Sequence, residues 1–378
     1  MEQSFSYWEQ KSFLSGFDVI IIGSGIVGLS AALRLVKQNP ALNVGILESG
    51  FLPSGASTKN AGFACFGSVS EVIDEIKSSG EESFLQLVEM RWKGLSRLRA
   101  NLGDDSISFK QYGGFEIFKD SEYIFAKECI EQIDYLNKLI QPIIGKHDIY
   151  AVSNAKIAEF GFSGVNTLIE NKYEGMLHTG KMMSSLIAKV AGLRVQILNC
   201  CKVQQFTGDA GEHRIFTSQG EFKARAIIVA TNAFARDLLP ELEVFPGRGQ
   251  ILVTEPIPDL KVRGAFHYNR GYTYFRNIDN RILLGGFRNL DTTAEQTTEP
   301  GLTDIVQTAL ENLLRETIRP GLNTQIEYRW SGVMGFGPEL QPIVKEIRPG
   351  VFCAVRCNGM GIAMGSLLGE QVADLVSI

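Results

Sequence analysis

Apolar and polar positions in this 378-residue chain follow two different patterns. Short apolar runs bounded by glycine or polar residues predict buried strands, and the clearest lie at 17–22, 44–47, 226–230 and 282–285. Apolar residues spaced three and four positions apart predict amphipathic helices at 29–38, 82–102 and 304–318. Strand, glycine turn and helix alternate near the start, whereas 248–286 reads as a run of strands. We therefore expect an α/β lobe and a second lobe built on a mixed or antiparallel sheet.

The first predicted strand runs directly into the turn Gly23-Ser24-Gly25-Ile26-Val27-Gly28 and then a helix. Gly23 permits a tight turn, Gly25 lets backbone approach a pyrophosphate, and Gly28 lets helix and strand pack closely. Glu48 ends the second predicted strand about 20 residues after Gly28, where a carboxylate hydrogen-bonds the ribose hydroxyls of a dinucleotide. Because a carboxylate repels the 2′-phosphate of NADP, the motif indicates FAD or NAD.

The loop after Glu48 is rich in small and hydroxyl side chains and carries one cation, in the order Ser49-Gly50-Phe51-Leu52-Pro53-Ser54-Gly55-Ala56-Ser57-Thr58-Lys59-Asn60-Ala61-Gly62. Here the chain resembles the superfamily of D-amino acid oxidase, glycine oxidase and sarcosine oxidase, whose members follow the ribose acid with Gly-Ala-Ser-x-Arg/Lys-Asn-x-Gly. The resemblance extends over most of the chain, through the segments 174–181, 226–234, 248–250 and 359–365. Asn232 and Phe234 depart from the residues that are commoner in the superfamily.

A second glycine turn near the end of the chain, 359–365, decides between the two dinucleotides. Its small residues let backbone approach a flat ring, and the helix expected at 366–376 points its positive end toward the pyrimidine, which stabilises a reduced anionic flavin. The pairing of two glycine turns favours FAD over NAD. Residues 333–336 offer no cysteine where some sarcosine oxidases attach the flavin covalently, so the resemblance implies noncovalent FAD. The expected cofactor-binding residues are Gly23, Gly25, Ile26, Val27, Gly28, Glu48, Ser49, Ala56, Ser57, Thr58, Lys59, Asn60, Ala61, Gly62, Val203, Ala230, Thr231, Asn232, Gly335, Gly359, Met360, Gly361, Ile362 and Ala363.

The expected fold is therefore α/β, with a discontinuous Rossmann-like FAD-binding domain and a second α+β substrate domain on a mixed or antiparallel sheet. Chains beyond about 250–300 residues divide into more than one core, which also predicts two lobes. We expect the FAD-binding domain at 1–90, 166–238 and 332–378, and the substrate domain at 91–165 and 239–331.

Candidate substrate-binding residues lie in the second lobe, where strand alternation places Tyr272, Tyr274 and Arg276 on one face. Arg276 is a candidate anchor for a carboxylate and the tyrosines for polar contacts, although a solvated edge strand fits the same pattern. Arg248 and Arg329 are rival anchors. Glycine and D-amino acid oxidases carry an arginine near the position of Met334, so a simple α-amino acid substrate is in doubt.

Two side chains admit both a catalytic and a structural interpretation. The cation of Lys59 is a candidate promoter of oxygen reduction beside the flavin, and a phosphate contact or a structural salt bridge is the alternative. His178 is expected to be a packed or surface histidine rather than a catalytic base.

Charge and composition narrow the partners. There are 37 Lys and Arg against 42 Asp and Glu, a net charge of −5, which gives no basic excess for nucleic acid. No basic start or long apolar run precedes the first strand, so we expect no signal peptide, no membrane span and a cytoplasmic location. The pairs Cys200/Cys201 and Cys353/Cys357 lack the spacing of a metal or redox motif, and no metal is expected.

The predicted function is FAD-dependent oxidation of a small amine or amino acid, by hydride transfer from Cα to flavin N5, hydrolysis of the imine, and reoxidation by O2 to give H2O2 or by a carrier. Within the superfamily the chain looks most like enzymes of larger amines such as γ-glutamylputrescine. Two alternatives stay open: a flavin dehydrogenase of a 2-hydroxy acid that passes electrons to a quinone or carrier, and a non-catalytic flavin-binding module.

Overall fold

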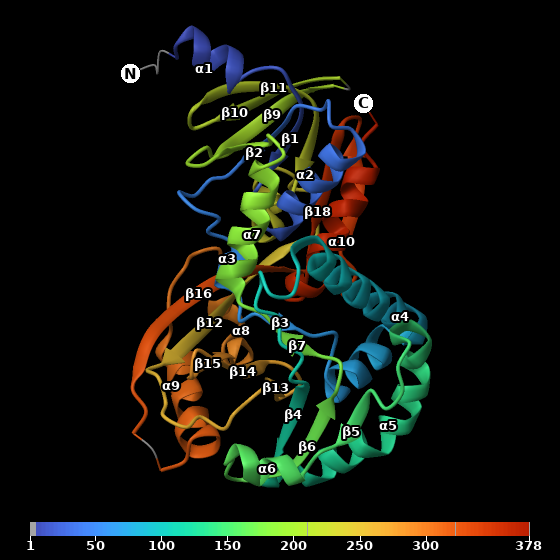
Figure 1. The fold of residues 1–378 in the computed structure, drawn as a ribbon, viewed down its shortest axis with the longest axis vertical. Helices are drawn as coiled ribbons and strands as arrows, with labels where there is room; N and C mark the ends of the chain where they lie inside the picture. Colours follow the sequence, from blue (N-terminus) through green and yellow to red (C-terminus); the bar gives the residue numbers. More distant parts are fainter. Residues whose placement is uncertain (1–4, 210, 322, 378) are drawn as a thin grey trace.

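The computed structural model describes residues 5–209, 211–321 and 323–377, and it has two lobes stacked along the long axis (Figure 1). One lobe is built on an eight-stranded sheet in which six strands follow the order β17-β18-β11-β1-β2-β8, and β10 and β9 extend antiparallel from β11. Its strands are β1 Phe17–Ile22, β2 Val44–Leu47, β8 Gln196–Leu198, β9 Val203–Asp209, β10 Glu212–Thr217, β11 Gly220–Val229, β17 Ile343–Arg348 and β18 Val351–Val355.

The central strands of this sheet are parallel and apolar, because helices cover them. β1 pairs in parallel with β2 and β11, and β11 pairs in parallel with β18. Helices α2 (Ile26–Gln38) and α10 (Gly361–Asp374) pack against each other. A Cβ on Gly369 would lie 2.5 Å from the carbonyl oxygen of Val27, so this glycine sets the close approach of the two helices.

The other lobe is built on a second eight-stranded sheet, with the order β16-β12-β15-β14-β13-β4-β6-β5. Adjacent strands in this sheet are antiparallel, except β13 and β4, which are parallel, so the sheet is mixed as predicted. Phe115, Phe266 and Phe275 stack across adjacent strands in its core, with centroids 5.0 and 4.6 Å apart. The strands are β4 Gly114–Lys119, β5 Tyr150–Val152, β6 Val165–Asn171, β12 Phe245–Thr254, β13 Ala265–Tyr268, β14 Thr273–Ile278, β15 Arg281–Gly286 and β16 Ile326–Phe336.

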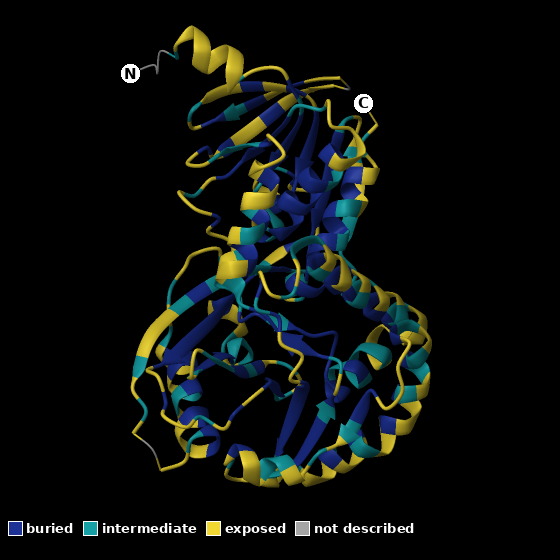
Figure 2. Cartoon of the chain, in the orientation of Figure 1, coloured by how far each residue is buried: buried dark blue, intermediate teal, exposed yellow. Residues whose placement is uncertain are grey.

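One long helix, α4 (Val69–Leu102), belongs to both lobes and bends at Gly80, whose φ is +82°. It packs against α10 of the first lobe and against α5 (Tyr123–Ile144) beside the second sheet, and Val69, Val72, Phe84 and Val88 share one apolar core with α5. Figure 2 shows both helices buried toward the sheet and exposed on their outer side. The remaining helices are α1 Tyr7–Ser12, α3 Ala56–Lys59, α6 Ala155–Phe160, α7 Thr179–Ala191, α8 Thr292–Glu295 and α9 Asp304–Leu313, and a two-stranded ladder joins β3 Phe63–Ala64 to β7 Gly175–Met176.

The sheets differ from the expected domain boundaries in two places. β6 lies in the second sheet although 166–238 was expected in the FAD-binding domain, because β6 pairs with β4 and β5. β16 continues through the expected boundary at 332, because it pairs with β12 as far as Phe336. No helix among the described residues is long and apolar enough to cross a membrane.

Candidate active site

The first glycine turn has the geometry that its sequence demands. Gly23 leaves β1 with φ +104°, and a Cβ there would lie 2.9 Å from the carbonyl oxygen of Ala230. A Cβ on Gly28 would lie 2.0 Å from the carbonyl oxygen of Gly23, so α2 begins in direct backbone contact with the turn. The backbone N–H groups at the start of α2 are thereby presented at the end of β1, as an anion requires.

Glu48 lies beside this turn and fixes its shape. Ser24 donates both its backbone N–H (3.1 Å) and its hydroxyl (2.6 Å) to Oε2 of Glu48. The N–H of Gly50 donates to Oε1 at 2.9 Å. Ser57, at the start of α3, accepts from the N–H of Ile26 at 3.0 Å and so links the loop after Glu48 to the glycine turn.

Hydrogen bonds to Asn232 connect the second glycine turn, near the C-terminus, to the end of β11. The side-chain oxygen of Asn232 accepts from the backbone N–H groups of Arg356 (3.0 Å) and Cys357 (3.2 Å), which tie the end of β11 to the turn at 357–363. Asn232 has φ +47°, a conformation that asparagine tolerates better than most residues. This contact gives a physical reason for its departure from the superfamily pattern.

A cavity of about 810 Å³ connects all these elements. Most of the expected cofactor-binding residues line it, namely Gly23, Gly25, Ile26, Val27, Glu48, Ser49, Ala56, Ser57, Lys59, Asn60, Ala61, Val203, Ala230, Thr231, Asn232, Gly359, Met360, Gly361, Ile362 and Ala363. Four others lie behind its wall, Gly28, Thr58, Gly62 and Gly335, and they shape it from there. The hydroxyl of Thr58, for example, donates to the carbonyl oxygen of Pro53 at 2.6 Å.

These residues fit an FAD molecule. The glycine turn offers amides for the pyrophosphate, Glu48 is a buried carboxylate that could take the ribose hydroxyls, and the turn at 359–363 lines the cavity with Gly359, Gly361 and Ala363 between two larger side chains. A Cβ on Gly361 would have no heavy atom closer than 3.9 Å, so its surface toward the cavity is open.

The substrate-lobe end of the cavity is aromatic. Tyr272 and Tyr274 both line it, as strand alternation predicts, together with Phe63 and Phe336. Tyr274 lies across Gly285 of the neighbouring strand, where a Cβ would be 2.7 Å from its ring. Burial raises the pKa of Tyr274 to about 12, so its hydroxyl stays protonated and can donate a hydrogen bond at neutral pH.

Arg276 shares the strand face of these tyrosines but does not line the cavity. Its guanidinium donates from Nη1 to the backbone carbonyl oxygens of Leu177 (2.6 Å), Gly62 (3.0 Å) and Ala61 (3.2 Å). Burial lowers its pKa to about 10, and those carbonyls compensate part of the cost. Alternation placed Arg276 on the correct face, but the loop 61–62 folds over it and separates it from the cavity.

The two other candidate carboxylate anchors, Arg248 and Arg329, already bind side chains of this chain. Arg248 is buried against Glu295 at 2.8 Å, and Arg329 pairs with Glu311 and Gln307.

His178 caps α7, where its Nδ1 accepts from the N–H of Lys181 at 3.2 Å. Lys59 lines the cavity at the end of α3, and the indole N–H of Trp330 donates to its backbone carbonyl at 2.9 Å.

Sequence reasoning missed Arg288, which lines the cavity next to Tyr272. Gly286 and Phe287 leave β15 with φ values of +122° and +57°, and this turn directs Arg288 back toward the cavity. Its guanidinium carbon lies 4.1 Å from the ring centroid of Phe336 and 5.6 Å from that of Tyr272. Among the described residues it takes part in no ion pair, and burial lowers its pKa. In the sequence, only its position just after the strand predicted at 282–285 indicated that it could lie near the cavity.

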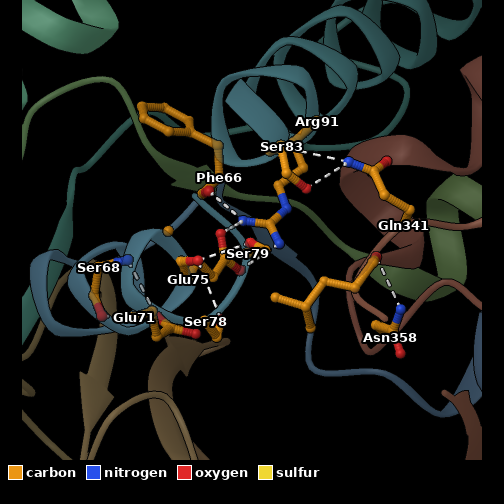
Figure 3. A network of polar contacts seen from close by, with 12 residues as sticks. Phe66, Ser68, Glu71, Glu75, Ser78, Ser79, Ser83, Arg91, Gln341 and Asn358 are labelled. Atoms are coloured by element: carbon orange, nitrogen blue, oxygen red, sulfur yellow. Dashed lines mark hydrogen bonds and ion pairs between the residues drawn. The ribbon is translucent and has the colours of Figure 1, made fainter. Parts of the chain in front are cut away.

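A polar face of α4 lines another part of the cavity. Figure 3 shows the polar contacts of this helix, with Glu75 next to Arg91. Glu71, Asp74, Glu75 and Ser78 follow the spacing of one helical face and all line the cavity. Glu75 pairs with the buried Arg91 at 2.6 Å, and Arg91 also donates to the carbonyl oxygen of Phe66. Asp74 pairs with Arg270. The carboxylates on this face are therefore mostly compensated by arginines of the same chain.

The cysteine pairs form no disulfide among the described residues. Cys200 is exposed, whereas Cys201, Cys353 and Cys357 are buried, and Cys201 and Cys357 line the cavity. Burial raises the pKa of Cys357 to about 12, so its thiol stays protonated at neutral pH.

Comparison with known proteins gives this architecture a family. The family model for FAD-dependent oxidoreductases, DAO, matches residues 18–375. The chain belongs to the DAO family. It is therefore an FAD-dependent oxidoreductase, as the family resemblance implied, and FAD is the dinucleotide that the two glycine turns predicted.

Individual relatives of this DAO family chain are distant but cover it almost completely. It is 26% identical to the γ-glutamylputrescine oxidoreductase of Escherichia coli (strain K12), over 95% of this chain and 83% of that protein. It is 24% identical to the glycine oxidase of Geobacillus kaustophilus (strain HTA426), over 95% and 93%. The crystal structure of L-proline dehydrogenase from P. horikoshii superposes with a TM-score of 0.76 at 20% identity, over 97% of this chain and 94% of that one, which confirms the fold.

Proposed function

We propose that this DAO family enzyme oxidises an amine or amino acid that carries a carboxylate held by Arg288, and that O2 accepts the electrons to give H2O2. The observation that carries the proposal is a guanidinium that lines the cavity with no acidic partner among the described residues. The other two arginines of the cavity lining, Arg91 and Arg270, each pair with a carboxylate of α4.

Arg288 is suited to an anionic group for electrostatic reasons. A partly buried guanidinium loses hydration, and a bidentate carboxylate restores both charge and hydrogen bonds. The rings of Phe336 and Tyr272 hold its plane at the edge of the cavity. Met334 lines the cavity where related oxidases of α-amino acids carry an arginine, so the bound carboxylate is expected at a different place relative to the reacting carbon.

The named relatives support an amine substrate. One is named for γ-glutamylputrescine, which has an amine at one end and an α-amino acid group at the other, and another for glycine. A substrate of the first kind could place its α-amino acid group at Arg288, which lines the same cavity as the glycine turns.

Bound FAD supplies an acceptor for the hydride that leaves the substrate carbon. The chain's own residues hold and shield the substrate: Arg288 orients its carboxylate, and Phe63, Tyr274 and Phe336 exclude water from the reacting end. The half-buried cation of Lys59 stabilises the negative charge that develops when oxygen is reduced. No side-chain base is required, because the substrate amine enters as the free base.

The test is an anaerobic absorption titration of the purified flavoprotein with amines, D- and L-amino acids, N-methyl amino acids and 2-hydroxy acids. Bleaching by an amine that carries a carboxylate, with peroxide formed after air is admitted, supports the proposal. Bleaching by hydroxy acids alone, with slow reoxidation, assigns the chain to the dehydrogenase alternative. Bound flavin that none of these compounds reduces favours a non-catalytic flavin-binding module.

A matched pair of variants tests the anchor. Arg288→Met is expected to raise KM for the carboxylate-bearing substrate, whereas Arg329→Met, which removes a rival already paired with Glu311, is expected to leave KM unchanged. The opposite result would assign the carboxylate to Arg329.

A further inference from the structure

Three buried side chains from separate segments meet at the second-lobe end of the cavity. Cys65 follows β3, Glu174 precedes β7, and His267 lies on β13. A ligand atom from each, the thiol sulfur, a carboxylate oxygen and a ring nitrogen, lies within 4.8 Å of the other two. Their exposed fractions are 2%, 1% and 8%, so none is a surface group that meets the others by chance. Cys65 and His267 also line the cavity.

Two atoms of this cluster are buried without a hydrogen-bond partner, Oε2 of Glu174 and Nε2 of His267. They lie 3.7 Å apart, beyond hydrogen-bond distance, and both face the space next to Cys65. A buried polar atom without a partner costs roughly 1–3 kcal/mol, so two of them side by side need an explanation. A ligand between them removes both costs.

Surrounding contacts hold the two side chains in this orientation. Oε1 of Glu174 accepts from the backbone N–H groups of Phe66 (2.7 Å) and Gly67 (2.9 Å), which leaves Oε2 directed at the cluster. A Cβ on Gly114 would lie 1.9 Å from that oxygen, so only glycine leaves room for it. Nδ1 of His267 lies 3.2 Å from a carboxylate oxygen of Glu71. In metal sites a carboxylate commonly takes one ring N–H of a ligating histidine in this way and leaves the other nitrogen for the metal.

We propose that Cys65, Glu174 and His267 bind a divalent cation of the Zn²⁺ type, with the fourth coordination position open to the cavity. One thiolate, one imidazole and one carboxylate form a donor set that suits zinc. Tetrahedral bonds of about 2.0–2.1 Å place nitrogen and oxygen roughly 3.3 Å apart, so the observed pair needs to close by only a few tenths of an ångström. Binding releases the thiol proton of Cys65 to solvent as the Zn–S bond forms.

The three proposed ligands are not among the residues expected to bind FAD, and the proposal does not depend on the proposed function. The residues that shape the glycine turns, such as Gly23, Glu48 and Gly361, belong to other segments of the cavity wall. A cation held by Cys65 and His267 can take water as its fourth ligand, or an amine or carboxylate of a molecule in the cavity.

The test uses the FAD-containing protein, freed of metal with a chelator and titrated with Zn²⁺ against a chromophoric competitor. One equivalent is expected to bind, and the zinc X-ray absorption spectrum is expected to show one sulfur at about 2.3 Å with nitrogen and oxygen neighbours at about 2.0–2.1 Å. Glu71→Gln, which removes the charge behind His267 and keeps an oxygen that can accept from Ser68, is expected to weaken binding roughly 10–100-fold. Cys65→Ser and His267→Gln are expected to weaken it more, and the control Cys353→Ser, a buried cysteine on β18, is expected to bind as the unaltered protein does.

Binding that Cys65→Ser and His267→Gln leave unchanged would overturn the proposal, and so would a spectrum without a sulfur neighbour. Absence of stoichiometric binding would overturn it as well and would leave the cluster as a buried imidazolium between the carboxylates of Glu71 and Glu174. The absorption spectrum needs only the unaltered protein, so the proposal stays testable if a variant does not fold.

Discussion

Replacing Gly28 with alanine is a stringent test of the cofactor site, because the structure leaves no room for one methyl group. The added Cβ would lie 2.0 Å from the carbonyl oxygen of Gly23, and the next heavy atoms are at 3.2 Å. Non-bonded atoms of this kind need roughly 3.3 Å or more, so α2 and the turn must separate by about 1.3 Å. That movement takes the amides at the start of α2 out of hydrogen-bond range of a pyrophosphate.

The loss can be estimated from those amides. Each hydrogen bond to a charged group contributes about 1.5–3 kcal/mol, so losing two of them costs roughly 3–6 kcal/mol. This corresponds to an FAD dissociation constant about 10²–10⁴-fold higher. The assay is a titration of the deflavinated protein with FAD, followed by quenching of flavin fluorescence, with thermal unfolding by circular dichroism as the measure of the fold.

Gly192→Ala is the matched control, because Gly192 at the end of α7 has helical backbone angles of −63° and −16°. The nearest atom to its added Cβ is the carbonyl oxygen of Ala188 at 3.3 Å, a contact that any helical alanine makes. Its FAD affinity is expected to be unchanged. If Gly28→Ala kept FAD affinity within about threefold of the unaltered protein, the pyrophosphate would not lie at this turn, and the reasoning from the glycine motif would fail.

Three further predictions follow from single side chains. Arg288→Met is expected to raise KM for a carboxylate-bearing substrate about 10–100-fold and to change kcat little. The reason is that the substitution removes a contact made equally in the ground and transition states. A loss of kcat as large as the rise in KM would contradict an anchoring role. Lys59→Met is expected to slow reoxidation of the reduced flavin by O2 in stopped-flow measurements while substrate reduction proceeds, and unchanged reoxidation would remove the catalytic role. Burial, and then the charge of Arg348, lower the pKa of His213, whose two ring nitrogens have no partner among the described residues. The unfolded chain therefore binds the proton first as pH falls below about 6.5, and stability declines by up to roughly 1.4 kcal/mol per pH unit. His213→Leu is expected to reduce that decline in denaturant titrations at pH 7.5 and 5.5, and an identical decline would show that other groups cause it.

Most of the residues predicted to bind the cofactor line one cavity, and they could be predicted because their part of the site is built from backbone. Gly23, Gly25 and Gly361 matter through what their missing side chains allow, and such constraints leave fixed spacings that a reader of the sequence can find. β1 and β2 were also predicted at their observed bounds, since continuous apolar runs mark strands buried on both faces.

The residues of the cavity in the second lobe could not be predicted in the same way, because a long side chain can adopt several rotamers that point in different directions. Alternation predicted one face for Tyr272 and Tyr274, which both line the cavity, but it could not show that loop 61–62 covers Arg276. Arg288 reaches the cavity only through the turn after β15. The cluster of Cys65, Glu174 and His267 is assembled from positions more than 90 residues apart along the chain, and pairing of that kind leaves no local pattern.

The interleaved order of strands in the first sheet has a consequence for the protein while it is being synthesised. β1 emerges from the ribosome early, yet its neighbour β11 ends at Val229 and the next strand, β18, ends at Val355. The apolar face of α2 that α10 covers stays without its partner until the segment 361–374 has been made. We therefore expect the nascent chain to depend on chaperones until α10 has been made, and FAD to be captured only after α10 has left the ribosome.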